Sequence, residues 1–598
     1  MPLLGAAVLA AIGRFLPRIA SDAVGCVFAA GTAAVAVAAL AGIASGDPYA
    51  VEWVGGWRPD SRGAGVGIVL VGDPMSLGLA VLTSLLVVAV LAYSWRYFEE
   101  PPRGHTGSFP ALVLVFQAAM CGFCVTGDLF NAFVFFELMG VVAYALTGFR
   151  VEERRPLQGA LAFGVTGSLG GYAMLLGVAM LYARTGELGL AQIGRRLGNG
   201  EPDALVLAAF VLLTAGMLVK AAAVPFHFWL PDAHAVAPTP VCLLLSGVMV
   251  ELGVYGAARF YWTVFAGPGG MPAEPVTRTL LAAGVLTALL GTAMCWQQRH
   301  LKRLLAFSTV AHTGLFLIGV GVLSPEGAAG TALYVLGHAG VKAALFACTG
   351  VLLDRYASVD EYELYGRARE LPLTAGLFLA GGLALAGLPP FGTALGKAVA
   401  EEAAGHTAQW LVAVFVLVSA VTGGAVLRAG LRVFAGAGPR PEGTSAQRGE
   451  ETTGDEEPET SGPLRRIPDT MLAVPLLLLA GALAVGLVPG IAAGAGRAGD
   501  LFATHGPYER AVLDGLTAPS EVFAAPHWTV AGVLLGLLSA GLACALALLG
   551  VRRPRPGRMA GIMAPVRRLQ SGHIGDYVAW VVVGMALLAA LAAPGVMS

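Results

Sequence analysis

The sequence predicts an all-α membrane protein whose chain crosses a bilayer many times. Only 13% of its 598 residues are charged, about half the fraction in an average soluble domain. Apolar residues make up 56% of the chain and occur in long runs such as 529–550 and 574–596. Runs of this length cross the hydrocarbon core of a bilayer as helices.

Sixteen apolar segments are candidate spans, each with roughly 20 predominantly apolar residues. The first segment precedes its arginines, Arg14 and Arg18. This is the reverse of the charge order in a signal peptide, so we expect a retained helix. We interpret 371–402 as one interrupted helix. The segments lie near 3–20, 22–45, 67–93, 109–126, 129–149, 158–183, 203–224, 236–265, 279–297, 302–323, 329–353, 371–402, 408–434, 470–492, 527–551 and 575–596.

With sixteen helices, every strongly basic loop falls on the same side of the membrane. The positive-inside rule makes this side cytoplasmic and places both termini outside. Arg195 and Arg196 are exceptions on the outer side. The basic loops hold Arg96 and Arg103; Arg150, Arg154 and Arg155; Arg299, Lys302 and Arg303; Arg355, Arg367 and Arg369; and the clusters at 428–466 and 552–568.

Composition favours neither nucleic acid binding nor a bound cofactor. The net charge is −1, so no global charge argument for nucleic acid exists. Cys121 and Cys124 have CxxC spacing, but they lie in an apolar run without a second pair. We interpret them as helix-packing residues. The sequence also lacks a GxGxxG after a strand and a haem ligand set, so no metal or cofactor site is predicted.

Four ionisable residues stand inside apolar segments, away from the ends: Glu137, Lys220, Lys342 and Lys397. Each costs about 2.5–3.5 kcal/mol at the centre of a membrane helix, so together they would cost roughly 10 kcal/mol facing lipid. One Glu cannot neutralise three lysines in a purely structural ion pair. We therefore predict a hydrated polar track, in which pairing with Glu137 holds Lys220 charged and loss of that pairing releases its proton.

Prolines interrupt two of these helices close to a lysine. VPFHFWLPDAH, with Pro225 and Pro231, follows Lys220, and GLPPFGTALGK ends in Lys397. Proline removes a helical hydrogen bond, and freed backbone groups at membrane depth need protein or water as partners. Broken helices in corresponding places of two halves are typical of an ion site between inverted repeats.

His227 and His234 flank Asp232 near the first break, and all three are of residue types that are able to bind a metal ion. The prolines interrupt the helix that would place them on one face, so we favour proton entry, or hydrogen bonds that hold the break.

In the second half, His338 lies one helical turn before Lys342, on the same helix face. This spacing predicts a proton relay. For His312, a relay and a packed histidine bonded to a carbonyl stay equally open.

Four segments together resemble the antiporter-like proton-translocating family: KAAAVPFHFWLPDAHAVAPTPV, HLKRLLAFSTVAHTGLFLIGVG, HAGVKAALFACTG and LAGLPPFGTALGK. The family includes antiporter-like subunits of respiratory complex I, subunits A and D of Mrp sodium/proton antiporters, and membrane subunits of hydrogenases of the formate hydrogenlyase type. The resemblance covers roughly 65–435.

The resemblance implies about fourteen core transmembrane helices with two inverted five-helix repeats and broken helices, plus about two extra C-terminal helices. Glu137, Lys220, Lys342 and Lys397 match the family's membrane-embedded charges. The expected parts are N-terminal helices 1–108, a first repeat 109–265, a second repeat 279–435, a disordered cytoplasmic linker 438–468 rich in Glu, Gly, Pro, Thr and Ser, and C-terminal helices 470–598.

One position departs from the family pattern. Where the family usually has a lysine in its eighth helix, this chain has Glu251. The residue at this position normally joins the two half-channels, so its reversed charge puts conduction in question.

We therefore expect a proton-translocating subunit of a multisubunit complex in the cell membrane, of the complex I or hydrogenase type. Its partners would be other membrane subunits, the transported ion a proton or also Na+, and any redox centre would lie in another subunit, so whether the complex is an enzyme stays open. Protons would enter near His227 and His234, charge Lys220, pass Glu251 to Lys342 and leave by Lys397. An Mrp-type cation/proton antiporter subunit and a non-conducting structural subunit are the alternatives.

Overall fold

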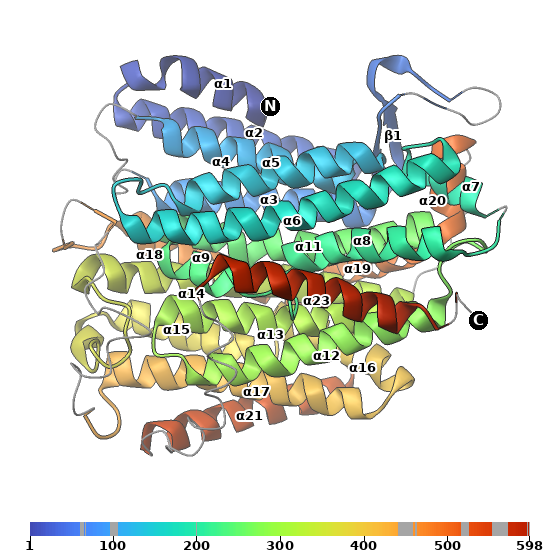
Figure 1. The fold of residues 1–598 in the computed structure, drawn as a ribbon. Coiled ribbons are helices and arrows are strands. Elements are labelled where there is room, and N and C mark those ends of the chain that lie inside the picture. Colours follow the sequence, from blue (N-terminus) through green and yellow to red (C-terminus); the bar gives the residue numbers. More distant parts are fainter. Residues whose placement is uncertain are drawn as a thin grey trace.

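The computed structural model is a bundle of long helices that run side by side in alternating directions (Figure 1). Among the described residues, thirteen helices are long and apolar enough to cross a membrane, and three shorter apolar helices accompany them. The predicted all-α, multi-pass class is confirmed. The structure describes residues 1–59, 65, 67–95, 106–198, 200–440, 459–460, 463–515, 525–552, 572–594 and 596.

The N-terminal part combines helices with a small antiparallel sheet at one end of the bundle. Its first helix is shorter than the predicted span, because Gly13 begins a tight turn and Pro17 precedes the next helix. The helix has 11 residues, about 16 Å, roughly half of the hydrocarbon core. The elements are α1 (Pro2–Ile12), η1 (Gly13–Phe15), α2 (Arg18–Ser45), β1 (Ala50–Trp53), η2 (Val54–Gly56), β2 (Val69–Gly72) and α3 (Pro74–Tyr93).

The first half of the body ends in a long buried helix, Thr239–Phe265, which contains two π-helical turns. Such turns often occur at functional sites. The elements are α4 (Ser108–Val125), α5 (Leu129–Thr147), α6 (Arg154–Thr185), α7 (Leu190–Leu197), α8 (Ala204–Lys220), α9 (Trp229–Val236), α10 (Thr239–Leu244), η3 (Leu245–Met249), α11 (Val250–Phe260) and η4 (Tyr261–Phe265).

The second half supplies the other two helices at the centre of the bundle. Leu301–Gly321 is buried throughout its most apolar stretch, and Pro325–Tyr356 almost throughout. Polar residues on these helices are therefore shielded from lipid. The elements are α12 (Ala273–Gln297), α13 (Leu301–Gly321), α14 (Pro325–Tyr356), η5 (Arg367–Glu370), α15 (Pro372–Leu385), α16 (Gly392–Thr407), α17 (Trp410–Gly430) and η6 (Leu431–Ala435).

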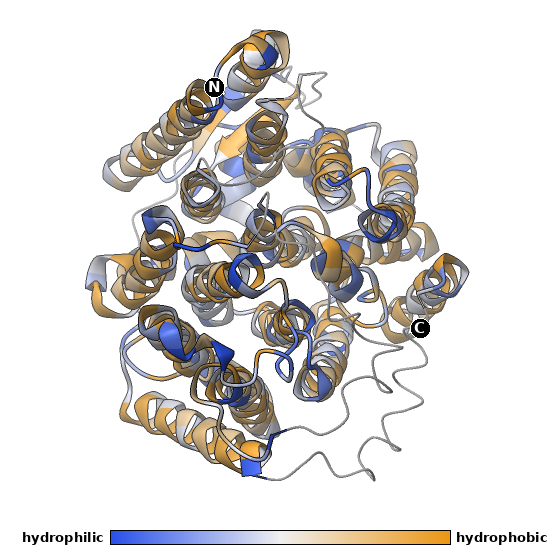
Figure 2. Ribbon diagram, turned by 90° about the vertical axis from the view of Figure 1, so that its left-hand side faces the viewer, coloured by the Kyte–Doolittle hydropathy of each residue, from blue (hydrophilic) through white to orange (hydrophobic). Residues whose placement is uncertain are grey.

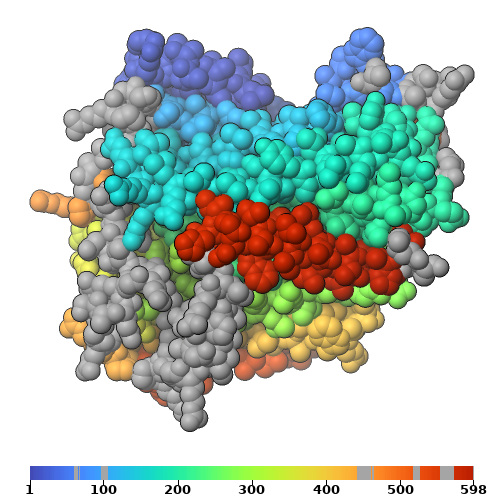
Figure 3. Space-filling model, in the orientation of Figure 1, coloured from blue at the N-terminus to red at the C-terminus, as the bar shows by residue number. Residues whose placement is uncertain are grey.

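The C-terminal helices lie against both halves of the body. α21 packs along α16 and α17, and α23 packs across α6, α8 and α12. In Figure 3, α23 is the red segment that crosses the near face of the molecule. The elements are α18 (Asp469–Leu487), α19 (Pro489–Phe502), α20 (His505–Leu513), α21 (Val530–Arg552) and α23 (Ile574–Ala592).

Ion pairs connect several predicted basic loops at one end of the bundle, the left in Figure 1. Arg299 pairs with Asp360, and Arg428 and Arg432 both pair with Glu361. Figure 2 views the bundle from this end, where hydrophilic segments lie over the ends of largely hydrophobic helices. The basic clusters at 96–103 and 553–568 lie outside the described residues.

The described part of the expected linker contains a buried contact. Glu459 is 2% exposed, and its Oε1 accepts hydrogen bonds from the Thr239 N–H (2.6 Å) and from Lys302 Nζ (3.2 Å). Its own N–H donates to Asp354 Oδ1 (2.7 Å). Residues 441–458 and 461–462 of the expected linker lie outside the described residues.

Candidate functional site

The first break separates α8 from α9. α8 ends at Lys220, and two residues later Ala222 adopts a positive φ of 50°. The Val224 N–H donates to Thr287 Oγ1 on α12 (3.0 Å). A protein side chain thus satisfies a backbone group freed by the break, as unwound chain at membrane depth requires.

The second break separates α15 from α16. α15 ends at Leu385, and Gly387 has a φ of 85°, a conformation that glycine adopts without a steric cost. The Thr393 hydroxyl, in the first turn of α16, donates to the Ala384 carbonyl (2.6 Å) and bridges the break. Both breaks predicted from the prolines are therefore present, each next to a membrane-embedded lysine.

Lys220 is buried at the first break. Its Nζ donates to the Phe136 carbonyl (3.3 Å) and lies 4.1 Å from the centre of the Phe136 ring. Neighbouring Glu137 forms no ion pair with Lys220, and its buried Oε1 has no hydrogen-bond partner among the described residues. That oxygen lies against Gly171 of α6. The structure therefore holds this Glu–Lys couple in its unpaired arrangement.

Lys342 is fully buried on α14 and contacts α13. Its Nζ donates to the Leu305 carbonyl and to Ser308 Oγ, both at 2.5 Å. The next residue on α13, Thr309, shares a hydrogen bond with Ser246 Oγ (3.0 Å). Polar groups thus extend from the lysine toward the helix that contains Ser246.

His234 continues this series. Its Nε2 is 2.8 Å from Ser246 Oγ, and its ring stacks on Phe346 of α14. His234 therefore belongs to the surroundings of Lys342. His227 has a different environment: its ring packs against Phe228, and its Nδ1 has no partner among the described residues.

Glu251 forms a direct contact with a histidine of the second half. Its Oε1 is 3.1 Å from His338 Nδ1, and both side chains are completely buried. The His338 ring stacks on His312 at 5.1 Å between centres. His312 bonds through Nδ1 to the Tyr334 hydroxyl (2.9 Å) and through Nε2 to Thr422 (3.0 Å). His312 is thus bonded to side chains, whereas one of the two expectations placed a carbonyl there.

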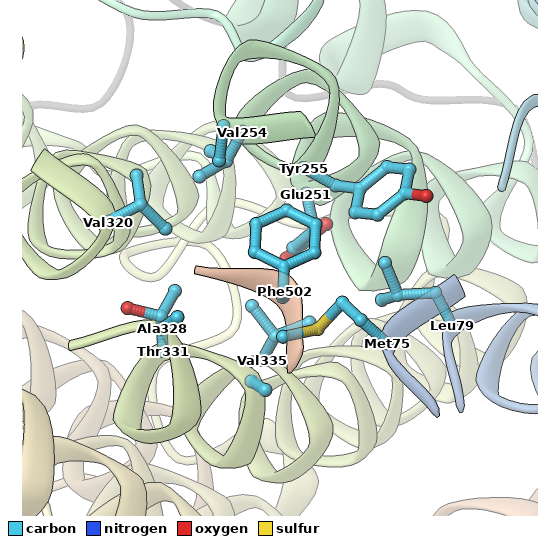
Figure 4. Close-up of a pocket in the computed structure, with 12 residues that line it drawn as sticks. Met75, Leu79, Glu251, Val254, Tyr255, Val320, Ala328, Thr331, Val335 and Phe502 are labelled. Carbon is cyan, nitrogen blue, oxygen red and sulfur yellow. The ribbon is translucent and has the colours of Figure 1, made fainter. Parts of the chain in front are cut away.

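A small cavity borders Glu251. Figure 4 shows α11, with Glu251 and Tyr255, on one side and α14, with Thr331 and Val335, on the other. Phe502 of α19 lies between them. The cavity volume is about 40 Å³, room for roughly three water molecules. Its lining is largely apolar, and Glu251 is its charged group.

Lys397 lies in the second turn of α16 and is held by two side chains. Its Nζ is 3.3 Å from Glu401 Oε2 and 3.1 Å from Ser539 Oγ of α21. Neither partner is among the residues predicted from the sequence. The i, i+4 spacing of Lys397 and Glu401 was a usable signal, whereas no local pattern points to Ser539.

Most of these contacts lie in a segment that matches a known family. The family model described as NADH:quinone oxidoreductase/Mrp antiporter, TM matches residues 126–423. NADH-quinone oxidoreductase subunit N of Desulforudis audaxviator is 37% identical over 372 residues, which are 61% of this chain and 72% of that protein. The chain belongs to this family. The match includes both breaks and all nine predicted site residues.

The chain is also similar to an antiporter subunit and to a chain of an Mrp complex. The putative antiporter subunit mnhD2 of Staphylococcus saprophyticus is 31% identical over 58% of this chain and 67% of its own. A chain of the Mrp complex from Dietzia sp. superposes with a TM-score of 0.73 at 28% identity, over 86% of this chain and 97% of that one. The protein is thus an antiporter-like, multi-pass protein of the cell membrane.

Proposed function

We propose that this chain is a proton-translocating subunit of a multisubunit membrane complex. The observation that carries the proposal is the buried Glu251–His338–His312 series. It joins α11 of the first half to α13 and α14 of the second half. Carboxylate and imidazole groups exchange protons, so this series offers a path between the halves. A histidine faces the reversed charge of Glu251, and this contact supports proton transfer at that position.

The contacts refine the proposed route. His234, Ser246, Thr309 and Ser308 extend polar groups toward Lys342, so an entry at His234 serves the second half directly. In the first half, the change between the unpaired and paired arrangements of Glu137 and Lys220 sets when Lys220 releases its proton. Protons leave by Lys397.

The partners are other membrane subunits, and any redox centre lies in another subunit. The relatives' names support this inference, because they describe subunits of quinone oxidoreductases and antiporters. An Mrp-type cation/proton antiporter subunit is the second candidate. One observation favours it over a complex I type: the Dietzia Mrp chain superposes with a TM-score of 0.73, whereas a chain of respiratory complex I from Thermus thermophilus superposes with a TM-score of 0.60.

The test compares Lys220→Ala with the wild type in membrane vesicles that contain the assembled complex. We expect Lys220→Ala to abolish proton uptake driven by an imposed membrane potential while the complex still assembles. Arg196→Ala, which removes a half-exposed cation outside the membrane spans, is the control. Full proton transport by Lys220→Ala in intact complexes would refute the proposal. Subunits recovered with the tagged chain would distinguish an oxidoreductase from an Mrp-type exchanger.

A further inference from the structure

The C-terminal helix α21 approaches the second break unusually closely. A Cβ added to Gly536 would lie 2.8 Å from the Gly387 carbonyl oxygen and 3.2 Å from Pro389 Cδ. Only glycine at this position lets the two backbones come so near. Residues three apart on a helix share a face, so the same face of α21 also presents Ser539 to α16.

Ser539 meets the buried lysine of the break. Lys397 Nζ donates to Ser539 Oγ (3.1 Å), and the Ser539 hydroxyl donates onward to the Leu535 carbonyl (2.8 Å). This chain of bonds leaves the serine oxygen as an acceptor for the lysine. Ser539 lies outside the 126–423 segment that matches the family, so the C-terminal part supplies a polar group to the track.

Glu401 lies on the other side of the same lysine. It is 2% exposed, and its Oε1 has no hydrogen-bond partner among the described residues. Glu401 lies one turn of α16, about 6 Å, beyond Lys397 in the direction of Thr407, where the helix ends. Next to it, Glu402 and His406 are already exposed. A free carboxylate oxygen between a buried lysine and an exposed helix end is placed to receive a proton.

We propose that Glu401 is the proton-release residue of the chain and that Ser539 is a positioning residue that holds Lys397 against it. In the release step, the N–H bond of the Lys397 ammonium breaks and an O–H bond forms on the Glu401 carboxylate. The lysine becomes a neutral amine and the glutamate a neutral acid. Glu401 then gives this proton to water at the Thr407 end of α16. The proposal rests on the proposed function, in which Lys397 is the last lysine of the path.

The test measures proton flux and its pH profile in vesicles containing the assembled complex, under an imposed potassium diffusion potential. We expect Glu401→Gln to lower the flux at least tenfold. Ser539→Ala should lower it by about tenfold, the size expected for one lost hydrogen bond to a charged group. It should also move the pH profile, and Ser539→Thr should restore both. Glu402→Gln and Cys544→Ala, exposed neighbours on the same helices, are the matched controls.

The pH profile reports the groups around Lys397. The titratable side chains that face this lysine are Glu401 on its own helix and His312 on α13, and Tyr334 on α14 faces Glu401. A purely structural role for Ser539 would lower the flux at every pH and leave the shape of the profile unchanged.

The outcomes separate this proposal from the broader one. If Lys397→Ala abolishes flux while Glu401→Gln and Ser539→Ala both keep the wild-type rate and pH profile, the release step proposed here is overturned and the path survives. If Lys397→Ala keeps full flux, both proposals fail. If Glu401→Gln does not assemble, Ser539→Ala still decides, because it removes no charge. An unchanged pH profile in that variant would overturn the proposal.

Discussion

Lysine and arginine differ in where they occur in this chain. Of the 37 lysines and arginines, only Lys220, Lys302, Lys342 and Lys397 are lysines. All four are 3% exposed or less. An arginine keeps its proton under all conditions met in proteins, whereas a buried lysine can release it. Lysine therefore occurs only at buried positions, three of which lie on the proposed path, whereas arginine occurs both at exposed positions and at buried ones such as Arg428.

The Glu251–His338 contact gives a prediction at this scale. Glu251→Gln keeps the shape and a hydrogen-bonding oxygen but loses the exchangeable proton. We expect at least a tenfold loss of proton flux with little change in stability. Glu251→Leu leaves His338 without its partner and should also destabilise the protein, by about 1–3 kcal/mol. Flux in vesicles and thermal unfolding in detergent measure the two effects, and wild-type flux in Glu251→Gln would exclude Glu251 from the path.

At the scale of elements, each broken helix is covered by one C-terminal helix. α21 lies on the second break through Gly536. α23 lies on the first break, where a Cβ on Gly584 would come within 2.4 Å of the Phe226 ring. α23 also contributes the Tyr577 hydroxyl, which donates to Asp232 Oδ2 (2.5 Å). Each of the two helices, α21 and α23, therefore combines a close contact through a glycine with a polar side-chain contact.

This packing predicts an asymmetric effect of adding one methyl group to α23. Gly584→Ala should destabilise the docked helix by about 1–3 kcal/mol, because the new methyl overlaps Phe226. Gly575→Ala in the same helix meets nothing within 4 Å and should be neutral or slightly stabilising. Thermal unfolding midpoints of the purified variants decide the matter, and equal midpoints would contradict the close approach of α23.

Sequence reasoning succeeded where the signal was local and failed where it depended on distant contacts. Both breaks were predictable from prolines and the spans from apolar runs, because these features depend only on residues that are neighbours in the sequence. The first helix was predicted too long because its apolar composition outweighed Gly13. Ser539 and Tyr577 meet partners 142 and 345 residues away. No periodicity within a segment reports such contacts.

For the whole molecule, the orientation in the membrane is testable from the loops at the two ends of the bundle. The positive-inside rule predicts that the 148–153 loop is cytoplasmic and that the 200–203 loop is external. In a background without native cysteines, Glu201→Cys should react with a membrane-impermeant thiol reagent in intact cells. Glu152→Cys should react only after permeabilisation. The reverse pattern would invert the predicted orientation.

The docking of α20 beside α7, at one end of the bundle, should depend on pH. His505 donates a hydrogen bond to Glu509, which raises the pKa of the imidazole above its usual 6.5. The same bond, together with Arg195, holds the pKa of Glu509 below its usual 4.5. The stabilisation of α20 by protonated His505 is complete below pH 6.5 and is lost as the pH rises through the raised pKa of the imidazole. The stabilisation of α20 by ionised Glu509 is complete above pH 4.5 and is lost as the pH falls through the lowered pKa of this carboxyl group. α20 should therefore dock most firmly between roughly pH 4.5 and 6.5.

Amide hydrogen exchange measures this docking. Between about pH 6 and 9, protection of 505–513, corrected for intrinsic exchange, should fall by roughly two- to fivefold, the range expected for a partly exposed pair. His505→Gln should abolish this dependence. His527→Gln, which replaces an exposed histidine, should retain it. Unchanged protection of the wild type across this range would show that the pair does not hold α20.

The position of the two covering helices in the chain has a consequence for biosynthesis. Ribosomes make α21 and α23 later than both unwound segments, which have by then entered the bilayer. Until both helices have been made, the nascent protein thus carries two uncovered breaks, and Lys397 lacks its contact with Ser539. Synthesis of α21 and α23 is therefore the step that covers both breaks, and a transcript truncated after α18 would encode a protein inserted in the membrane with both breaks uncovered.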